Sequence, residues 1–332
     1  MSLLRWLLLF SLLLAACAPS FQDCAQERVV CAVFLFHPWE AEPIGEQVWQ
    51  ALETAQRAGT LQGIWRISVQ DGRDRERELR WMAEQGVDIL ITPSASWSEA
   101  TQAVASIFSR QRFIAIDQTP LEQANLPNVT VIRIPYDQMG FLAGALSARL
   151  TQTRRVAAIC EAEFIPAMRQ ACDGFVQGVL FTDRKVFVYR QHRQGSRDLF
   201  FQDEKWGRET ADRFIRDGAD VIFAIGGGTA RAALEQAAAD QALILGGGED
   251  LYDTLPTLRK RWVGAPLPEV QTTLETLFAT TRHLPWPSVA EGRLIWAPFR
   301  GYGESLPLSL RAEMELLRLQ LQEGTIRTGV AP

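Results

Sequence analysis

Acidic residues stand directly after apolar runs of strand length, where a small polar ligand could be held. Asp117 closes the run 113–116, and Glu161 and Asp250 come shortly after two later runs of the same kind. A carboxylate accepts strong hydrogen bonds from charged and neutral donors. Asp117 is therefore a candidate contact for a ligand amine or hydroxyl, and the alternative is a turn residue that starts the next loop.

Aromatic residues could add a flat apolar face to such a site. Trp39 lies in the loop 37–43, which begins with His37 directly after an apolar run, and both residues are candidate ligand contacts. Stacking on an aromatic side chain contributes about 1–3 kcal/mol per base in nucleic-acid complexes. Packing beneath its own loop is an equal alternative for Trp39. Phe200 is a further candidate, although it precedes a second phenylalanine and such an apolar pair is more often part of a core.

Two turns carry small residues that a ligand could approach. Residues 226–229 read Gly-Gly-Gly-Thr between an apolar run and a helical pattern. Backbone N–H groups near Gly227 could therefore hold a polar or anionic group at the start of a helix. No Gly-Lys-Ser/Thr follows, so this is not a Walker loop, and close backbone approach without a ligand is the alternative. Ser94, in the turn after the run 88–91, is another candidate contact.

Patterns of catalysis and metal binding are missing from the sequence. His37, His192 and His283 are scattered and have no metal-ligand spacing. No Gly-x-Ser-x-Gly nucleophile elbow occurs. We therefore expect a binding protein and not an enzyme, with no metal and no cofactor.

The elements that would position these residues form two successive series of apolar strands and amphipathic helices. The first series has predicted strands at 29–36, 64–69, 88–91, 113–117 and 128–134. The second has predicted strands at 156–159, 185–189, 221–225 and 242–245. Apolar strands alternating with helices indicate parallel sheets covered on both faces. The sequence thus predicts an α/β protein of two Rossmann-like lobes.

The division into lobes follows from this order. We assign 29–135 with about 265–297 to lobe I, and 136–264 with about 298–325 to lobe II. In open parallel sheets a ligand binds outside the carboxyl ends of the strands, and pockets favour domain interfaces. We therefore expect the ligand in a cleft between the lobes.

The N-terminus has the pattern of an export signal. Arg5 precedes the apolar run 6–14, which is too short for the roughly 20 residues that span a bilayer. Residues 14–17 read Leu-Ala-Ala-Cys and resemble a bacterial lipobox, in which Cys17 becomes the lipidated first residue. We predict a signal peptide at 1–16 and a tether at 17–28. The alternative is an ordinary signal peptide with a chance cysteine.

Composition limits the classes of binding partner that are expected, but it does not determine how the cysteines pair. The net charge is −5, from 34 basic and 39 acidic residues, so no basic surface for nucleic acid is expected. Four cysteines follow Cys17, and four cysteines allow three pairings. They are Cys24, Cys31, Cys160 and Cys172. We favour buried thiols over disulfides, because Cys31 and Cys160 lie in strand-like runs and free cysteine is often buried.

Several stretches share their order with one protein family. They include FIAID at 113–117, NVTVIRIPYDQMGFLAGALSA at 128–148, Asp-Gly-Phe at 173–175 with Gly178, and GADVIFAIGGGTARAA at 218–233. This order resembles the basic-membrane-protein group of substrate-binding lipoproteins, which includes purine-nucleoside receptors of ABC transporters. The resemblance implies the type I periplasmic-binding fold, a clamshell of two lobes, and a nucleoside-like ligand.

The chain departs from the family pattern near the expected ligand. The loop 37–43 replaces an aspartate- and glycine-rich loop, and Gly248 stands where the family has an acidic residue. Of the contacts that the resemblance implies, Asp117 and Asp250 keep their residue type. Phe200 lies in a segment that matches a family loop near the ligand.

Together these features predict an extracytoplasmic solute-binding lipoprotein of an ABC importer, anchored to the membrane through Cys17. We expect a monomer that captures a small polar ligand and docks on an ABC permease. One alternative is a receptor that reports a ligand to a membrane kinase. The other is a secreted hydrolase that uses two acidic residues of the cleft.

Overall fold

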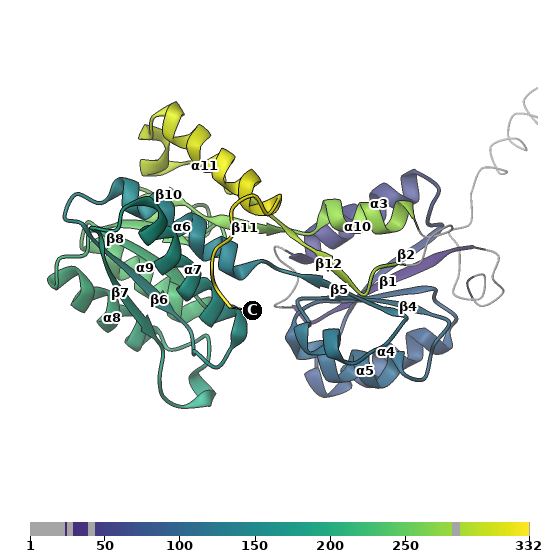
Figure 1. The fold of residues 1–332 in the computed structure, drawn as a ribbon. Coiled ribbons are helices and arrows are strands. Elements are labelled where there is room, and N and C mark those ends of the chain that lie inside the picture. Colours follow the sequence, from purple (N-terminus) through teal and green to yellow (C-terminus); the bar gives the residue numbers. More distant parts are fainter. Residues whose placement is uncertain (1–23, 25–28, 39–43, 281–285, 332) are drawn as a thin grey trace, which may run out of the picture. The chain divides into compact units, whose positions relative to one another are not determined.

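The protein is described here from a computed structural model that covers residues 24, 29–38, 44–280 and 286–331 (Figure 1). These residues divide into two compact units. The first takes the chain up to Arg133 together with Val270–Glu291, and the second takes Ile134–Glu269 and the chain from Gly292 onward. Residues 265–269 and 292–297, which the sequence analysis assigned to lobe I, thus belong to the second unit. Their strands pair with each other there and not with the first sheet.

The first unit is built on a six-stranded sheet in the order β12-β5-β4-β3-β1-β2, with every pairing parallel. Its strands are β1 (Cys31–Phe36), β2 (Gly63–Ser68), β3 (Ile89–Thr92), β4 (Arg112–Ile116), β5 (Val129–Arg133) and β12 (Val289–Glu291). The central strands β1 and β3 are apolar except for Thr92 at the end of β3, because both faces of the sheet are covered.

Two pairs of helices cover this sheet. The helices are α3 (Glu46–Arg57), α4 (Arg75–Glu84), α5 (Ser98–Ala105) and α10 (Gln271–Ala279). Leu52 of α3 and Phe278 of α10 share one core cluster with Ile114. Leu79 of α4 and Val104 of α5 share the other cluster. Figure 1 shows α3 and α10 on one face of the sheet and α4 and α5 on the other.

A late strand completes the first sheet. Thr130 donates its hydroxyl to the carbonyl of Pro287 at 2.7 Å, and Arg133 forms an ion pair with Glu291 at 2.8 Å. These bonds fix β12 beside β5, so a segment that is distant in sequence closes the edge. This strand was not predicted from the sequence, because it has only three residues and none of them is buried.

The second unit has a five-stranded parallel sheet in the order β10-β9-β8-β6-β7. Its strands are β6 (Arg155–Cys160), β7 (Phe187–His192), β8 (Val221–Ile225), β9 (Leu243–Gly246) and β10 (Trp262–Gly264). An antiparallel pair, β11 (Pro266–Glu269) and β13 (Arg293–Trp296), accompanies it. The helices are α6 (Tyr136–Leu150), α7 (Pro166–Thr182), α8 (Glu204–Arg216), α9 (Gly227–Ala239) and α11 (Leu308–Gln322).

Alternating side chains of β8 show which helices cover which face of this sheet. Ile222 packs in one cluster with Ala211 of α8 and Leu234 of α9. Phe223, which points to the opposite face, stacks on Phe175 of α7 with ring centroids 5.2 Å apart. The helices α6 and α7 therefore cover the face that α8 and α9 leave free.

Four glycines let α6 and α7 touch backbone to backbone. A Cβ atom built on Gly140 or Gly144 of α6 would overlap a carbonyl oxygen of α7. The same is true of Gly174 and Gly178 of α7, whose Cβ atoms would overlap carbonyl oxygens of α6. No residue with a side chain fits at these positions without moving a helix.

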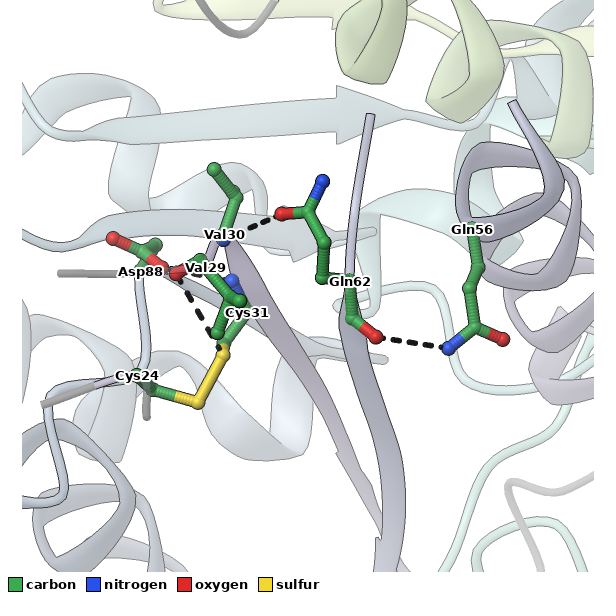
Figure 2. The surroundings of a disulfide bond; sticks show 7 residues. All are labelled: Cys24, Val29, Val30, Cys31, Gln56, Gln62 and Asp88. Carbon is green, nitrogen blue, oxygen red and sulfur yellow. Dashed lines mark hydrogen bonds between the residues drawn. A yellow bond between two sulfur atoms is a disulfide. The ribbon is translucent and has the colours of Figure 1, made fainter. Parts of the chain in front are cut away.

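Two disulfides show that the expected buried thiols are wrong. Cys24 bonds to Cys31 at the start of β1, with Cα atoms 5.8 Å apart, as Figure 2 shows. Cys160, at the end of β6, bonds to Cys172 of α7, with Cα atoms 6.2 Å apart. Both separations lie within the range that a disulfide spans. The helix that packs on β6 brings the second pair together, and residue types alone do not reveal such proximity.

Hydrogen bonds fix the strand that carries the first disulfide. The backbone N–H of Cys31 donates to the Asp88 carboxylate at 2.8 Å, and the N–H of Val30 donates to the Gln62 side chain at 2.8 Å (Figure 2). Gln62 in turn accepts at its carbonyl from Gln56 of α3 at 3.0 Å. The beginning of β1 is thereby tied to its neighbours in the sheet and to the covering helix.

Candidate functional site

The predicted contacts fall at the carboxyl edges of the two sheets. His37, Ser94 and Asp117 follow β1, β3 and β4 of the first sheet. In the second sheet, Glu161 follows β6 and Gly227 follows β8. Asp250 comes four residues after β9. Trp39 and Cys17 lie outside the described residues.

Two residues of the first edge have left-handed backbones. Ser94 has φ 59° and Asp117 has φ 56°. This conformation costs a residue with a side chain about 1–2 kcal/mol. The neighbouring strands β3 and β4 therefore both end in a strained turn, and such strain often accompanies a binding site. The N–H of Asp117 donates to the Ile132 carbonyl at 2.8 Å, which keeps its half-buried side chain at the edge.

A neutral hydrogen-bond network lies beneath this edge. Gln118 is fully buried and donates to the Thr92 carbonyl at 3.0 Å and to the Thr92 hydroxyl at 2.9 Å. Thr92 also pairs with the Thr101 hydroxyl of α5 at 3.0 Å. The ends of β3 and β4 are thereby joined to a covering helix. This role of Gln118 was not predicted from the sequence, because a polar side chain in a loop gives no sign of burial.

His37 lies at the carboxyl edge of the first sheet, on the side of β2. Its Nε2 lies 3.0 Å from the carbonyl oxygen of Gln70, in the loop after β2. The ring is partly exposed and thus joins two loops at the carboxyl ends of adjacent strands.

The second edge is built on a buried ion-pair network. Glu161 and Arg193 have no exposed side-chain surface, and Glu161 Oε1 lies 3.6 Å from Arg193 Nη1. Arg193 also donates to Asp203 at 3.1 Å and to the carbonyl of Ser196 at 2.7 Å. Glu161 accepts from the backbone N–H of Phe201 at 3.0 Å. The carboxylate of Glu161 therefore holds the loop 193–203 in place, and Arg193 and Asp203 are residues of this edge that sequence reasoning missed.

The glycine turn packs against the same loop. Gly226 and Gly227 have φ 122° and 57°, conformations that favour glycine. A Cβ at Gly226 would press on Glu161, and one at Gly227 would press on Phe201. The N–H of Gly228 donates to the carbonyl of Phe201 at 2.7 Å. Close backbone approach, the alternative considered for this turn, is thus present in the structure.

An aromatic pair forms the outer surface of the second edge. Phe164, which is 61% exposed, contacts Phe200 with ring centroids 5.1 Å apart. The Arg193 guanidinium lies 5.3 Å from the Phe200 ring, and the Arg197 guanidinium lies 5.5 Å from the Phe164 ring. Phe200 is partly exposed rather than buried in a core. The pair offers flat apolar faces whose orientation two cations help to fix.

Asp250 is bound to a late segment of the chain. Arg300 pairs with Asp250 at 2.5 Å and with Asp253 at 2.6 Å, and its guanidinium lies 4.4 Å from the Tyr252 ring. The hydrogen bond to Asp253 and then that to Asp250 raise the pKa of Arg300 above its ordinary value. One carboxylate oxygen of Asp250 therefore anchors the segment after β13 to the loop after β9. Nothing in the sequence around Arg300 signals this pairing.

Much of the chain matches a known protein family. Residues 29–254 match the model of a family described as PnrA-like ABC transporter substrate-binding proteins. The chain belongs to this family. A search among curated proteins found no match. The match to the family model confirms the resemblance seen in the sequence.

Several solved structures share the fold of this chain. A solute-binding protein of an ABC transporter system from Conexibacter woesei matches with a TM-score of 0.70 at 18% identity, over 90% of this chain and 98% of that chain. A solute-binding protein from Aeropyrum pernix matches with a TM-score of 0.65 at 15% identity, over 91% and 94%. A transcriptional activator of the comK gene from Bacillus halodurans reaches 0.68 at 13%, over 89% and 98%. The predicted fold, two Rossmann-like lobes of the type I periplasmic-binding class, is confirmed.

Membership of the PnrA-like family indicates the general role of the protein. ABC substrate-binding proteins bind small molecules outside the cytoplasm and work with membrane permeases. Within the part of the chain that the structure describes, no helix has both the length and the apolar character to cross a bilayer.

Proposed function

We propose that this PnrA-like protein captures a small polar ligand with a planar ring, of the nucleoside class, for an ABC importer. The observation that carries the proposal is the exposed pair of Phe164 and Phe200 at the carboxyl edge of the second sheet. Stacking on such faces suits a ring of any base, and the edge of a parallel sheet is where ligands bind. We separately propose the half-buried carboxylate of Asp117, at the edge of the first sheet, as an acceptor for hydroxyl or amine groups of a ligand.

The carboxylates of the second edge support binding over hydrolysis. Glu161 has no exposed side-chain surface, and its two oxygens accept backbone hydrogen bonds. Asp250 is bound to Arg300. A hydrolase would need acidic groups within hydrogen-bond reach of the reacting atoms. Glu161 and Asp250 instead act as positioning residues for the loops that carry Phe200 and Tyr252.

Calorimetry with purified protein tests the ligand class. Nucleosides, free bases, sugars and amino acids would be titrated in turn, after native mass spectrometry has identified any ligand that copurifies. We expect nucleosides to bind, and Phe164→Leu to weaken binding while leaving the fold intact. Tight binding of a sugar or an amino acid, with no nucleoside bound, would overturn the proposed class.

Asp117→Ala tests the polar side of the site. Loss of one charge-assisted hydrogen bond, at about 1.4 kcal/mol or more, weakens binding by roughly tenfold or more. The matched control is Glu122→Gln, which removes a carboxylate of the following loop that pairs with Arg133. Equal affinities for the wild-type protein and the Asp117→Ala variant would remove Asp117 from the site.

We also propose that the protein is anchored outside the cytoplasm through a lipid on Cys17. The support is the sequence 5–17, with its short apolar run and terminal Leu-Ala-Ala-Cys. Two or more acyl chains provide a stable anchor, because each buried CH₂ contributes about 0.8 kcal/mol. Fractionation of cells that make the Cys17→Ser variant checks this: the variant should leave the membrane fraction, and an unchanged distribution would contradict the anchor.

Delivery to a permease can be separated from signalling to a membrane kinase. The fold does not choose between them, since it is shared with a protein described as a transcriptional activator. We propose transport by a monomer that docks on an ABC permease. Deletion of the gene should abolish uptake of the labelled ligand, whereas a receptor for a kinase would leave uptake intact and change gene expression.

A further inference from the structure

A cluster of two sulfur atoms and one imidazole lies under the carboxyl edge of the second sheet. Cys160 ends β6, His192 is its partner on the adjacent strand β7, and Cys172 lies on the helix α7. The two Sγ atoms and a ring nitrogen of His192 all lie within 4.8 Å of one another. In the structure the sulfur atoms are joined in a disulfide. The proposed ligand-binding function makes no use of this cluster.

The imidazole of His192 is held in the form that binds metals. Its Nδ1 lies 3.0 Å from the carbonyl oxygen of Glu161. A carbonyl can only accept a hydrogen bond, so in the neutral imidazole Nδ1 carries the proton and Nε2 keeps a free lone pair. Metal-binding histidines commonly have this second hydrogen bond to a carbonyl or carboxylate.

The free nitrogen of His192 has no other role in the described part of the chain. Nε2 is buried and has no hydrogen-bond partner there, and the residue is only 9% exposed. A buried polar atom without a partner is uncommon and costs stability. A ligand that accepts the lone pair would satisfy it, and both sulfur atoms lie within 4.8 Å of a ring nitrogen of this histidine.

We propose that the reduced form of this cluster binds one thiophilic metal ion of the zinc class. Reduction needs an external dithiol, which supplies two electrons and two protons and itself becomes a disulfide. The Cys160–Cys172 bond breaks, and two thiols form. Binding of Zn²⁺ then releases both thiol protons, so that two thiolates and the neutral imidazole are the ligands.

A zinc-class ion would hold the two sulfur atoms further apart than the disulfide does. Zinc–sulfur bonds of about 2.3 Å and zinc–nitrogen bonds of about 2.0–2.1 Å place tetrahedral ligands roughly 3.5–3.8 Å apart. Three protein ligands leave the fourth position to water, as in open zinc sites. The disulfide joins β6 to α7, and the metal ion would join both of them to β7 as well.

The other disulfide provides an internal control. Cys24 and Cys31 are joined in the same way, but no histidine or carboxylate of the described residues completes a three-ligand group with them. If metal binding required only a reduced cysteine pair, both pairs would bind. If it requires the imidazole, only Cys160 and Cys172 will.

Cobalt titration of the full chain tests the site. A Cys17→Ser/Cys24→Ser/Cys31→Ser variant keeps Cys160 and Cys172 as its only cysteines. The variant is reduced with dithiothreitol, freed of reductant without oxygen, and titrated with Co²⁺. We expect one ion per chain with a thiolate-to-cobalt absorption band, displacement by Zn²⁺, and no band for the oxidised protein. Affinity should rise with pH, because binding releases protons.

Two further variants decide the role of each ligand. Adding His192→Gln should weaken cobalt binding roughly tenfold or more, since a ligand is lost. A Cys17→Ser/Cys160→Ser/Cys172→Ser variant, which keeps Cys24 and Cys31, should show no stoichiometric binding. Undiminished affinity with His192→Gln would overturn the proposal. So would a reduced protein whose circular dichroism shows that the fold is lost, because the site needs β6, β7 and α7 together.

Discussion

The two carboxyl edges have the same topology but are held by different forces. Beneath the first edge, Gln118 joins β3 and β4 through neutral hydrogen bonds to Thr92. At the second edge, the charges of Glu161, Arg193 and Asp203 hold the loop between β7 and α8. Breaking a buried ion pair leaves a charge without a partner, whereas breaking the neutral network leaves an uncharged polar group without one, which costs less. The same kind of loop is therefore far more sensitive to a single substitution in the second unit.

Arg193→Met gives the largest expected effect. Methionine fills similar space but leaves Glu161 and Asp203 without their cation, so we expect a loss of about 3–5 kcal/mol. Hydrogen–deuterium exchange followed by mass spectrometry reports on each unit separately, and the loss should appear in β6, β7 and α8. Arg197→Met, at an exposed position, is the matched control. Equal protection in both variants would show that the buried network does not stabilise the edge.

Gln118→Met makes the same type of replacement at the first edge. We expect a cost of about 1–3 kcal/mol, because the buried carbonyl of Thr92 loses the donor Gln118 but no charge is left unpaired. Thr92 keeps its partner Thr101, and the buried Oε1 of Gln118, which has no partner among the described residues, disappears. The same exchange measurement on β3 and β4 checks this value. A loss as large as that of Arg193→Met would refute the contrast between neutral and charged edges.

We expect the smallest effect on stability at Asp71, which forms a solvent-exposed ion pair with Arg73 in the first unit. The side-chain hydrogen bond from Arg73, followed by its backbone N–H, lowers the pKa of Asp71 from 3.8 to about 2. Because the folded pKa is lower than the unfolded one, the stabilisation is present above pH 3.8 and is lost as the pH falls through about 2. Carboxyl NMR titration should show this midpoint, and Arg73→Met should return it toward 3.8. An Asp71 that titrates at its ordinary value would contradict the interaction.

Periodicity in the sequence located most of the fold. The predicted strand at 221–225 coincides with β8, and that at 113–117 contains most of β4, with Asp117 just beyond the observed end. β8 is apolar throughout and β4 is apolar after Arg112, and parallel sheets buried on both faces require this composition. The short strand β12 lacks that composition and is set by hydrogen bonds to β5, so local patterns could not reveal it.

The candidate site was only partly predictable. The end of a strand is visible in a sequence, and this placed Asp117 and Glu161 at the ends of β4 and β6. What the side chains contact there depends on residues far along the chain: Arg193 and Asp203 for Glu161, and Arg300 for Asp250. The disulfides were mispredicted for the same reason, because cysteine pairing depends on which helix packs on which strand.

The glycines between α6 and α7 affect how genetic variation in this protein would be read. At Gly140, Gly144, Gly174 and Gly178, every missense change adds a Cβ atom where a carbonyl oxygen of the partner helix already lies. No nucleotide substitution that changes the amino acid is conservative there. We therefore expect these four codons to be under strong purifying selection. A ranking of positions by evolutionary constraint would place them beside or above the ligand contacts, although they record only how closely two helices lie.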